Sequence, residues 1–174
     1  EVLKLDWNAR GLVAADLETG KLRWQFPDPR QAEEQPLDFR TCPVRCGDTL
    51  VAACTRQGTS AEVWLVGLSL SGELLWKRFL CASSALQPYH PQAEPALACD
   101  AERVYCLTQL GVLIAAEGRT GRTLWAYRYG NDPPRQPPQG RGRGILLPRA
   151  GAADTLAAFR PLSMPLVAGG VVYA

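Results

Sequence analysis

The sequence predicts an all-β protein, a β-propeller of four-stranded antiparallel blades of which only part of the ring is present. Three observations lead to this prediction: short apolar runs alternate with turns, a Trp recurs about every fifty residues, and a Pro-led strand pattern precedes the later copies. Repeats of about 40–50 residues with four strands each are typical of β-propellers. Helical repeats would need an apolar period of about 3.6 residues, which is absent, and an immunoglobulin-like sandwich would not repeat its own sequence.

Composition is that of a globular protein and excludes several classes. The 174 residues are 47% hydrophobic and 21% charged, and 16 Gly and 14 Pro indicate frequent turns. A net charge of +2 argues against a strongly electrostatic nucleic-acid binder. No apolar run approaches the ~18 residues of a membrane helix. The chain begins at Glu1 without a signal-peptide pattern, so we expect it to be processed or cut from a longer protein.

The first repeated element is a turn followed by a Trp. In each copy an apolar run leads to a hydroxyl residue and a Gly, and the Trp stands four residues after the Gly. Such a pair is typical of a hairpin turn, where Gly adopts a positive φ at little cost. A recurring Trp can bury on the order of 200 Å², enough to close the boundary with a neighbouring sheet. The three pairs are Gly20 and Trp24, Gly72 and Trp76, and Gly121 and Trp125.

The second element begins at a Pro and contains two short strands around a polar or Gly turn. It occurs at 43–52, 95–105 and 165–173. Together the two elements predict the later strands of one blade at 1–26, complete blades at 43–79 and 95–127, an insertion loop at 131–162, and the opening strands of a further blade at 165–174. Propellers close with at least four blades. We therefore expect the missing blades to come from a longer protein or from other chains.

These residues resemble the pyrroloquinoline-quinone (PQQ)-like repeat, whose pattern is Ala-x-Asp-x-x-Thr-Gly-Lys-x-x-Trp. The resemblance covers about 12–127 and 165–174, and it implies the fold more specifically than the function. The repeat is found in quinoprotein dehydrogenases and in non-enzymatic relatives, among them a propeller lipoprotein that helps to assemble bacterial outer-membrane proteins. The matching positions are Ala14, Asp16, Thr19, Gly20, Lys21 and Trp24 in the first copy, Gly72 and Trp76 with Ser69 in the Asp place in the second, and Ala115, Glu117, Thr120, Gly121, Arg122 and Trp125 in the third.

The resemblance leaves three functions open. The first, which we favour, is a non-catalytic scaffold or ligand-binding module with no cofactor, which binds a protein partner or the missing blades and is exported, for instance to the bacterial periplasm. The second is a fragment of a dehydrogenase that uses PQQ and Ca²⁺. Many such enzymes have a disulfide between adjacent cysteines, which this sequence lacks, and Asn131-Asp132 is its only Asn-Asp pair. The third is a sensor domain attached to a kinase or transport component.

The repeat carboxylates Asp16 and Glu117 have two interpretations. They could line a binding surface, but a carboxylate just before a tight turn more often accepts hydrogen bonds from turn amides. Trp64 lies within a predicted strand, where core or inter-blade packing explains it.

Cysteine and histidine give little support for a metal site or a catalytic triad. The six cysteines form no C-x-x-C pair, and His90 is the single histidine. Four cysteines lie in or beside apolar runs, where a free thiol behaves as a small hydrophobe, although disulfides are the alternative. These four are Cys46, Cys54, Cys99 and Cys106.

The insertion at 131–162 breaks the repeat. It is rich in Pro, Gly and Arg, a composition that cannot build a core and predicts a long loop, with a short helix at 152–159. Its positive charge suggests an anion- or partner-binding loop, and the alternative is a solvated excursion, since aromatic residues that would stack on bases are missing. The basic residues are Arg135, Arg141, Arg143 and Arg149.

Overall fold

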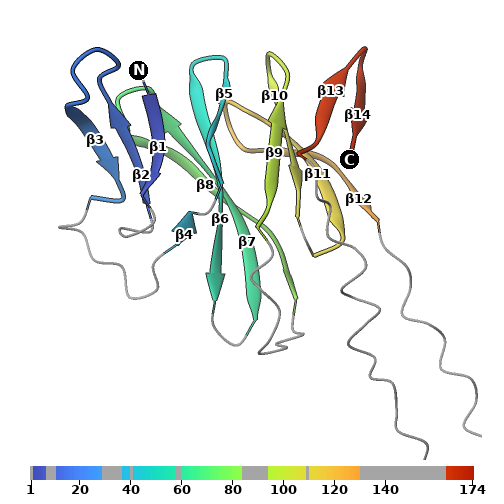
Figure 1. Cartoon of the computed structure of the whole chain (residues 1–174). Helices are drawn as coiled ribbons and strands as arrows, with labels where there is room; N and C mark the ends of the chain where they lie inside the picture. The colour runs from blue at the N-terminus through green and yellow to red at the C-terminus, as the bar shows by residue number, and fades with distance from the viewer. Residues whose placement is uncertain are drawn as a thin grey trace, which may run out of the picture.

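The described part of the chain consists of strands and turns. The computed structural model describes residues 2–6, 11–28, 37–39, 41–57, 60–83, 94–108, 110–129 and 164–174, and none of these is helical. Four antiparallel sheets follow one another in chain order and lie side by side (Figure 1). The short, turn-bounded apolar runs of the sequence produce this pattern.

The first sheet is a meander whose neighbours in sequence pair with one another, and the second departs from a meander at its first two strands. The first has the order β1-β2-β3, with β1 at Val2–Asp6, β2 at Gly11–Ala15 and β3 at Leu22–Phe26. The second is larger, because both β4 and β5 pair with β6, and β7 and β8 follow. Its strands are β4 (Asp38–Phe39), β5 (Val44–Cys46), β6 (Thr49–Gln57), β7 (Ala61–Ser69) and β8 (Leu74–Ser83).

The third sheet has four strands in the order β9-β10-β11-β12, and β13 pairs with β14 to form the last. The strands are β9 (Ala96–Cys99), β10 (Arg103–Leu107), β11 (Val112–Glu117), β12 (Thr123–Arg128), β13 (Leu166–Ala168) and β14 (Val171–Tyr173). The leading strands of successive sheets contact one another, β5 with β9 and β9 with β13. A series of more than two such sheets, each packed on the next through corresponding strands, is the arrangement of propeller blades, whereas a sandwich has two sheets. The predicted fold class, an all-β propeller with part of its ring present, is confirmed.

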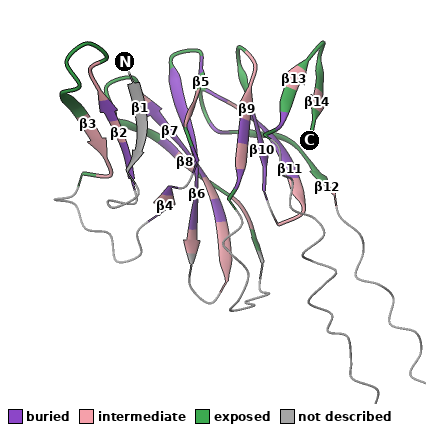
Figure 2. Ribbon diagram, viewed as in Figure 1, coloured by how far each residue is buried: buried purple, intermediate pink, exposed green. Residues whose placement is uncertain are grey.

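The core lies between the sheets. One apolar cluster fills the boundary between the first and second sheets, and another fills the boundary between the second and third. Strand β6 contributes to both, because its successive side chains point to opposite faces. Leu50, Ala52 and Cys54 face the first sheet, and Val51 and Ala53 face the third. The second sheet is therefore covered on both faces, as the buried strands in Figure 2 show.

The Gly-Trp element has a positive-φ glycine in each of the first three sheets. Gly20, Gly72 and Gly121 have φ values of 68°, 87° and 69°, as the hairpin interpretation predicts. The pairing register also shifts at corresponding places, between Ala14 and Ala15, Gly67 and Leu68, and Ala115 and Ala116. A bulge increases the local twist of a strand pair. The repeat in sequence is thus a repeat in backbone geometry.

Candidate functional site at the sheet boundaries

Asp16 binds the turn that follows it. Its Oδ1 accepts hydrogen bonds from the amides of Glu18 and Thr19 at 3.2 and 2.9 Å and from the Thr19 hydroxyl at 2.9 Å. Its Oδ2 forms an ion pair with Arg23 at 2.8 Å. The Thr19 amide, followed by Arg23, holds the pKa of Asp16 well below its ordinary value of 3.8. The carboxylate therefore has the turn-binding role expected of an Asp before a tight turn.

The third copy repeats this turn with a longer side chain. The Thr120 hydroxyl donates to Glu117, and the Arg122 guanidinium lies 3.6 Å from the same carboxylate. The Thr120 hydrogen bond is the main cause that lowers the pKa of Glu117. The Gly121 amide donates to the Glu117 carbonyl at 2.8 Å, just as Gly20 donates to Asp16 at 2.9 Å.

In the second copy Ser69 takes the acidic position, and its turn is one residue shorter. The Gly72 amide donates to the Ser69 carbonyl at 3.0 Å, three residues back instead of four. The Ser69 hydroxyl accepts from the Glu73 amide at 3.0 Å. The shorter turn follows from the sequence, because Ser69 and Gly72 are three residues apart whereas Asp16 and Gly20 are four apart.

Trp24 closes the boundary between the first and second sheets. Its Nε1 donates to the Leu70 carbonyl at 3.0 Å, in the turn between β7 and β8. Its ring lies against Gly72 so closely that a methyl group there would be 2.5 Å from Cδ2. Phe26, two residues on, meets Phe39 edge to face with ring centroids 5.9 Å apart. The turn glycine of the second sheet is therefore the surface on which Trp24 docks.

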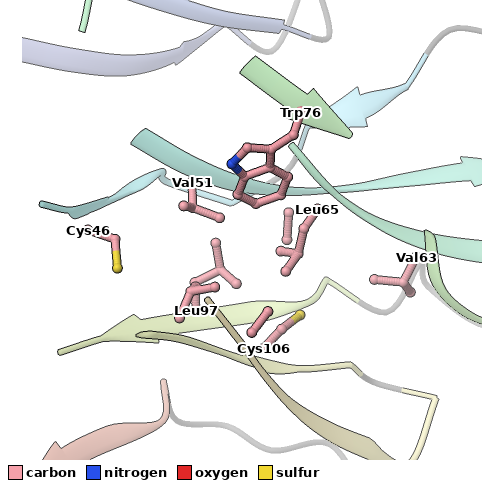
Figure 3. Close-up of a cluster of buried hydrophobic side chains, with 10 residues drawn as sticks. Cys46, Val51, Val63, Leu65, Trp76, Leu97 and Cys106 are labelled. Atoms are coloured by element: carbon pink, nitrogen blue, oxygen red, sulfur yellow. The ribbon is translucent and has the colours of Figure 1, made fainter. Parts of the chain in front are cut away.

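Trp76 closes the next boundary in the same way, with a different ring placement. It is 8% exposed, and Figure 3 shows it above Val51 and Leu65, with Leu97 and Cys106 of the third sheet across the cluster. A methyl group at Gly121 would lie 2.5 Å from its Cε3. Its Nε1 is buried without a hydrogen-bond partner among the described residues, so packing alone holds this indole.

Trp125 occupies the corresponding position in the third sheet but is 41% exposed. It pairs with Ala115, as Trp24 pairs with Ala14. Its ring contact is with Tyr105 of its own sheet, at 6.1 Å between centroids. Neighbouring Tyr127 is 63% exposed and Leu124 is exposed too. The structure thus brings two of the three repeat Trp residues onto the turn glycine of a following sheet, whereas no glycine of the described residues lies against the third.

Gly67 is a residue of this site that sequence reasoning missed. It lies in β7 directly opposite Trp76, where a methyl group would fall 2.1 Å from the indole Cε2. Gly118, after β11, likewise has no room for a methyl group, which would be 2.3 Å from Cys46 Sγ. A Gly within or just after an apolar strand signals close approach of a bulky neighbour, and that signal was available in the sequence.

Trp64 packs between the first two sheets, as expected. It meets Phe79 edge to face at 5.3 Å, and its Nε1 donates to Glu62 Oε2 at 2.9 Å. The Arg56 guanidinium carbon lies 5.0 Å from the Trp64 ring centroid and Lys77 Nζ lies 5.3 Å from it. Trp64, and secondly Arg56, lower the pKa of Glu62.

The six cysteines, all within the described ranges, carry thiols and no disulfide. Cys46, Cys54 and Cys106 are buried. Burial raises the pKa of Cys46 to about 11 and that of Cys106 further. At neutral pH these two thiols are protonated, and all three pack as small apolar side chains.

Several predicted features lie outside the described residues. They are the insertion at 131–162 with its short helix, the four arginines Arg135, Arg141, Arg143 and Arg149, the pair Asn131-Asp132, and His90. Within the described ranges, no group of three or more His, Cys, Asp or Glu side chains could hold a metal ion. No helix there is long and apolar enough to cross a membrane.

Comparison with known proteins finds similarity among solved structures. No family model matches the chain, and no curated protein matches it. Among solved structures the chain is similar to BamB from Moraxella catarrhalis, with 22% identity and a TM-score of 0.47. The similarity covers 69% of this chain and 31% of the BamB chain, so this chain spans about a third of that protein's length.

Proposed function

We propose that this chain is part of a PQQ-like repeat propeller that acts without catalysis, as a scaffold that presents its surface to a protein partner or ligand. The proposal rests on the contacts that the repeat residues make within the chain. Asp16, Glu117 and Ser69 bind their own turns, and Trp24 and Trp76 dock on the next sheet. In this chain the motif builds blades, so we assign function to the surfaces outside it.

The ring units of this proposal are the blades at 1–26, 43–79 and 95–127 and the opening strands at 165–174. We further propose that the protein is exported, as members of the family that the repeat resembles often are. The stretch 131–162, with its four arginines, is the proposed partner-contact segment, since an insertion between blades lies where repeat proteins place their binding loops.

A cofactor assay tests the non-catalytic part of the proposal. The chain is incubated with PQQ and Ca²⁺, and quinone absorbance and dye-linked alcohol oxidation are recorded. We expect no saturable binding and no turnover. Saturable turnover would overturn the proposal in favour of a dehydrogenase.

A capture experiment tests the partner-contact segment. The chain is cross-linked to its partners in an extract of its source organism, and the captured proteins are identified. The unmodified protein is compared with a variant in which Arg135, Arg141, Arg143 and Arg149 are changed to Ala. A control variant changes the exposed Arg103, Arg119 and Arg128 instead. We expect one partner to be lost only from the first variant. The same partners in all three samples would remove the segment from the proposal.

A further inference from the structure

We propose that Cys46 and Cys99 are a redox pair that closes into a disulfide between the second and third sheets. The thiolate of Cys99 attacks a low-molecular-weight disulfide such as oxidised glutathione and releases one glutathione thiolate. The Cys46 thiolate then attacks the Cys99 sulfur of the mixed disulfide and releases the second glutathione. The two protein thiols thus lose two protons and two electrons, which reduce one glutathione disulfide to two thiols. This inference concerns how the sheets are linked and does not depend on the proposed function.

The two cysteines lie on the leading strands of successive sheets. Cys46 is the last residue of β5 and Cys99 is the last residue of β9, and these strands contact each other. Cys46 is buried in the cluster between the two sheets, and Cys99 packs against that cluster from the third sheet. Figure 3 shows Cys46 directed from the second sheet toward the third, with Leu97 across the boundary. Cys99 lies on the same face of β9 as Leu97, two residues earlier, so both thiols face this boundary from opposite sheets.

Each thiol reaches the backbone next to the other cysteine. The Cys99 thiol donates to the carbonyl of Arg45 at 3.0 Å, and Arg45 directly precedes Cys46. The Cys46 thiol donates to the carbonyl of Asp100 at 3.7 Å, and Asp100 directly follows Cys99. A disulfide spans about 4.4–6.8 Å between Cα atoms, and Cα atoms of β5 and β9 lie within 8 Å of each other. We therefore expect the disulfide to close by rotation of both side chains with a small approach of the strands.

The neighbouring thiols are placed less well to pair with either cysteine. Cys81 packs against the same cluster, but it lies on β8, at the opposite edge of the second sheet from β5. Cys106 is fully buried, and Figure 3 shows it across the cluster from Cys46. Cys54 belongs to the cluster on the other face of the second sheet. Cys46 and Cys99 are therefore the pair that the geometry favours.

Burial sets the order of the two steps. Cys46 is 4% exposed, whereas Cys99 is only partly buried, so Cys99 is the thiol that a glutathione molecule reaches first. Burial raises the pKa of Cys46 to about 11 and also raises the pKa of Cys99. Both thiols are therefore protonated at neutral pH and react through a small thiolate fraction.

The test brings the folded chain to equilibrium with reduced and oxidised glutathione at about pH 8.5, where a larger fraction of each thiol is ionised. Oxidised glutathione is raised until the exposed Cys42 carries a mixed disulfide, which shows that the oxidant is active. The remaining thiols are alkylated, and peptide mass spectrometry without reduction identifies the linked cysteines. The unmodified chain is compared with Cys99→Ala and with a matched control, Cys81→Ala, which removes the other partly buried thiol at this boundary.

We expect a Cys46–Cys99 linkage in the unmodified chain and in Cys81→Ala, and its loss in Cys99→Ala. The midpoint of urea unfolding should rise by about 1–2 M in the linked chain, as for a cross-link that closes a long loop, and dithiothreitol should reverse the rise. The proposal is overturned if Cys42 carries glutathione while Cys46 and Cys99 are not joined to each other. A linkage that leaves the midpoint unchanged or lowers it would overturn the proposal too, because the two thiols would then not meet in the native arrangement of the sheets.

Discussion

Trp76 and Trp125 hold the same place in successive sheets, yet one is 8% exposed and the other 41%. Each stands four residues after a positive-φ glycine, on the last strand of its sheet. The next sheet differs between the two. Gly121 of the third sheet lies against Trp76, whereas no glycine turn of the described residues lies against Trp125. The residue opposite each Trp in its own sheet also differs, since Trp76 lies over Gly67 and Trp125 stands opposite Ala115.

The largest expected effect is the loss of Trp76. Trp76→Ala removes a buried indole from the cluster between the second and third sheets and leaves a cavity, which costs about 3–5 kcal/mol of unfolding free energy. Trp125→Ala in the same chain should cost about 1 kcal/mol, the centre of the range for single substitutions. Urea unfolding of both variants measures the difference, and equal losses would contradict the assignment of Trp76 to a closed boundary.

The next effect separates the backbone role of a turn glycine from its docking role. Gly121 and Gly20 have nearly the same φ, 69° and 68°. An Ala at either position must adopt the left-handed conformation, which lowers the free energy of unfolding by about 1–2 kcal/mol. Only at Gly121 does the added methyl meet an indole, at 2.5 Å. We expect Gly121→Ala to cost a further 1–3 kcal/mol, roughly the range for overpacking.

Thermal or urea unfolding of the two Ala variants gives this comparison directly. Because the φ cost is common to both, the difference between them reports the contacts of the added methyl group at Gly121, with the Trp76 indole at 2.5 Å and with Arg78 Cγ at 2.7 Å. If Gly20→Ala is at least as destabilising as Gly121→Ala, the added methyl group at Gly121 makes no costly contact, which would contradict the docking of Trp76 there.

The smallest effect is that of the turn carboxylate. Asp16→Asn weakens the ion pair with Arg23 and the acceptor for the Thr19 amide, so we expect a modest fall in the melting temperature and unchanged ligand binding. The pKa of Asp16 is lower in the folded chain than its ordinary 3.8. Its contribution is therefore complete above that value and is lost as the pH falls toward the folded value.

A pH series distinguishes this carboxylate from the others. Between about pH 5 and pH 2 the melting temperature of Asp16→Asn should fall less steeply than that of the unmodified chain, because one linked proton is absent. Parallel curves would show that Asp16 has the same pKa in both states and does not bind its turn in solution.

The short-range features of the repeat could be predicted from the sequence. Gly-Trp spacing and the hydroxyl residue before Gly20, Gly72 and Gly121 are short-range signals, and they led to the hairpins, the positive φ values and the fold class. The role of Asp16 followed in the same way, since its partners lie two to seven residues away.

The contacts between residues far apart in the chain could not be predicted from the sequence. Trp24 donates to Leu70, 46 residues on, and nothing in either residue's neighbourhood selects the other. Gly67, within an apolar strand, signals the close approach of a bulky neighbour, but only the pairing of β7 with β8 identifies that neighbour as Trp76. The exposure of Trp125 depends on what its face meets, so the prediction that all three Trp residues close a boundary applies within the described residues to Trp24 and Trp76 only.

The central claim is that a Trp of one sheet docks on the turn glycine of the next, and a double-mutant cycle of Trp76 and Gly121 tests it most directly. If the indole rests on Gly121, the methyl group of Gly121→Ala loses its clash with Trp76 in the Trp76→Ala background, and its cost falls toward that of Gly20→Ala, with the contact to Arg78 Cγ remaining. We predict a coupling energy of about 1–3 kcal/mol between the two positions, the upper range for residues in contact. A coupling energy within about 0.3 kcal/mol of zero, as for independent sites, would contradict the claim.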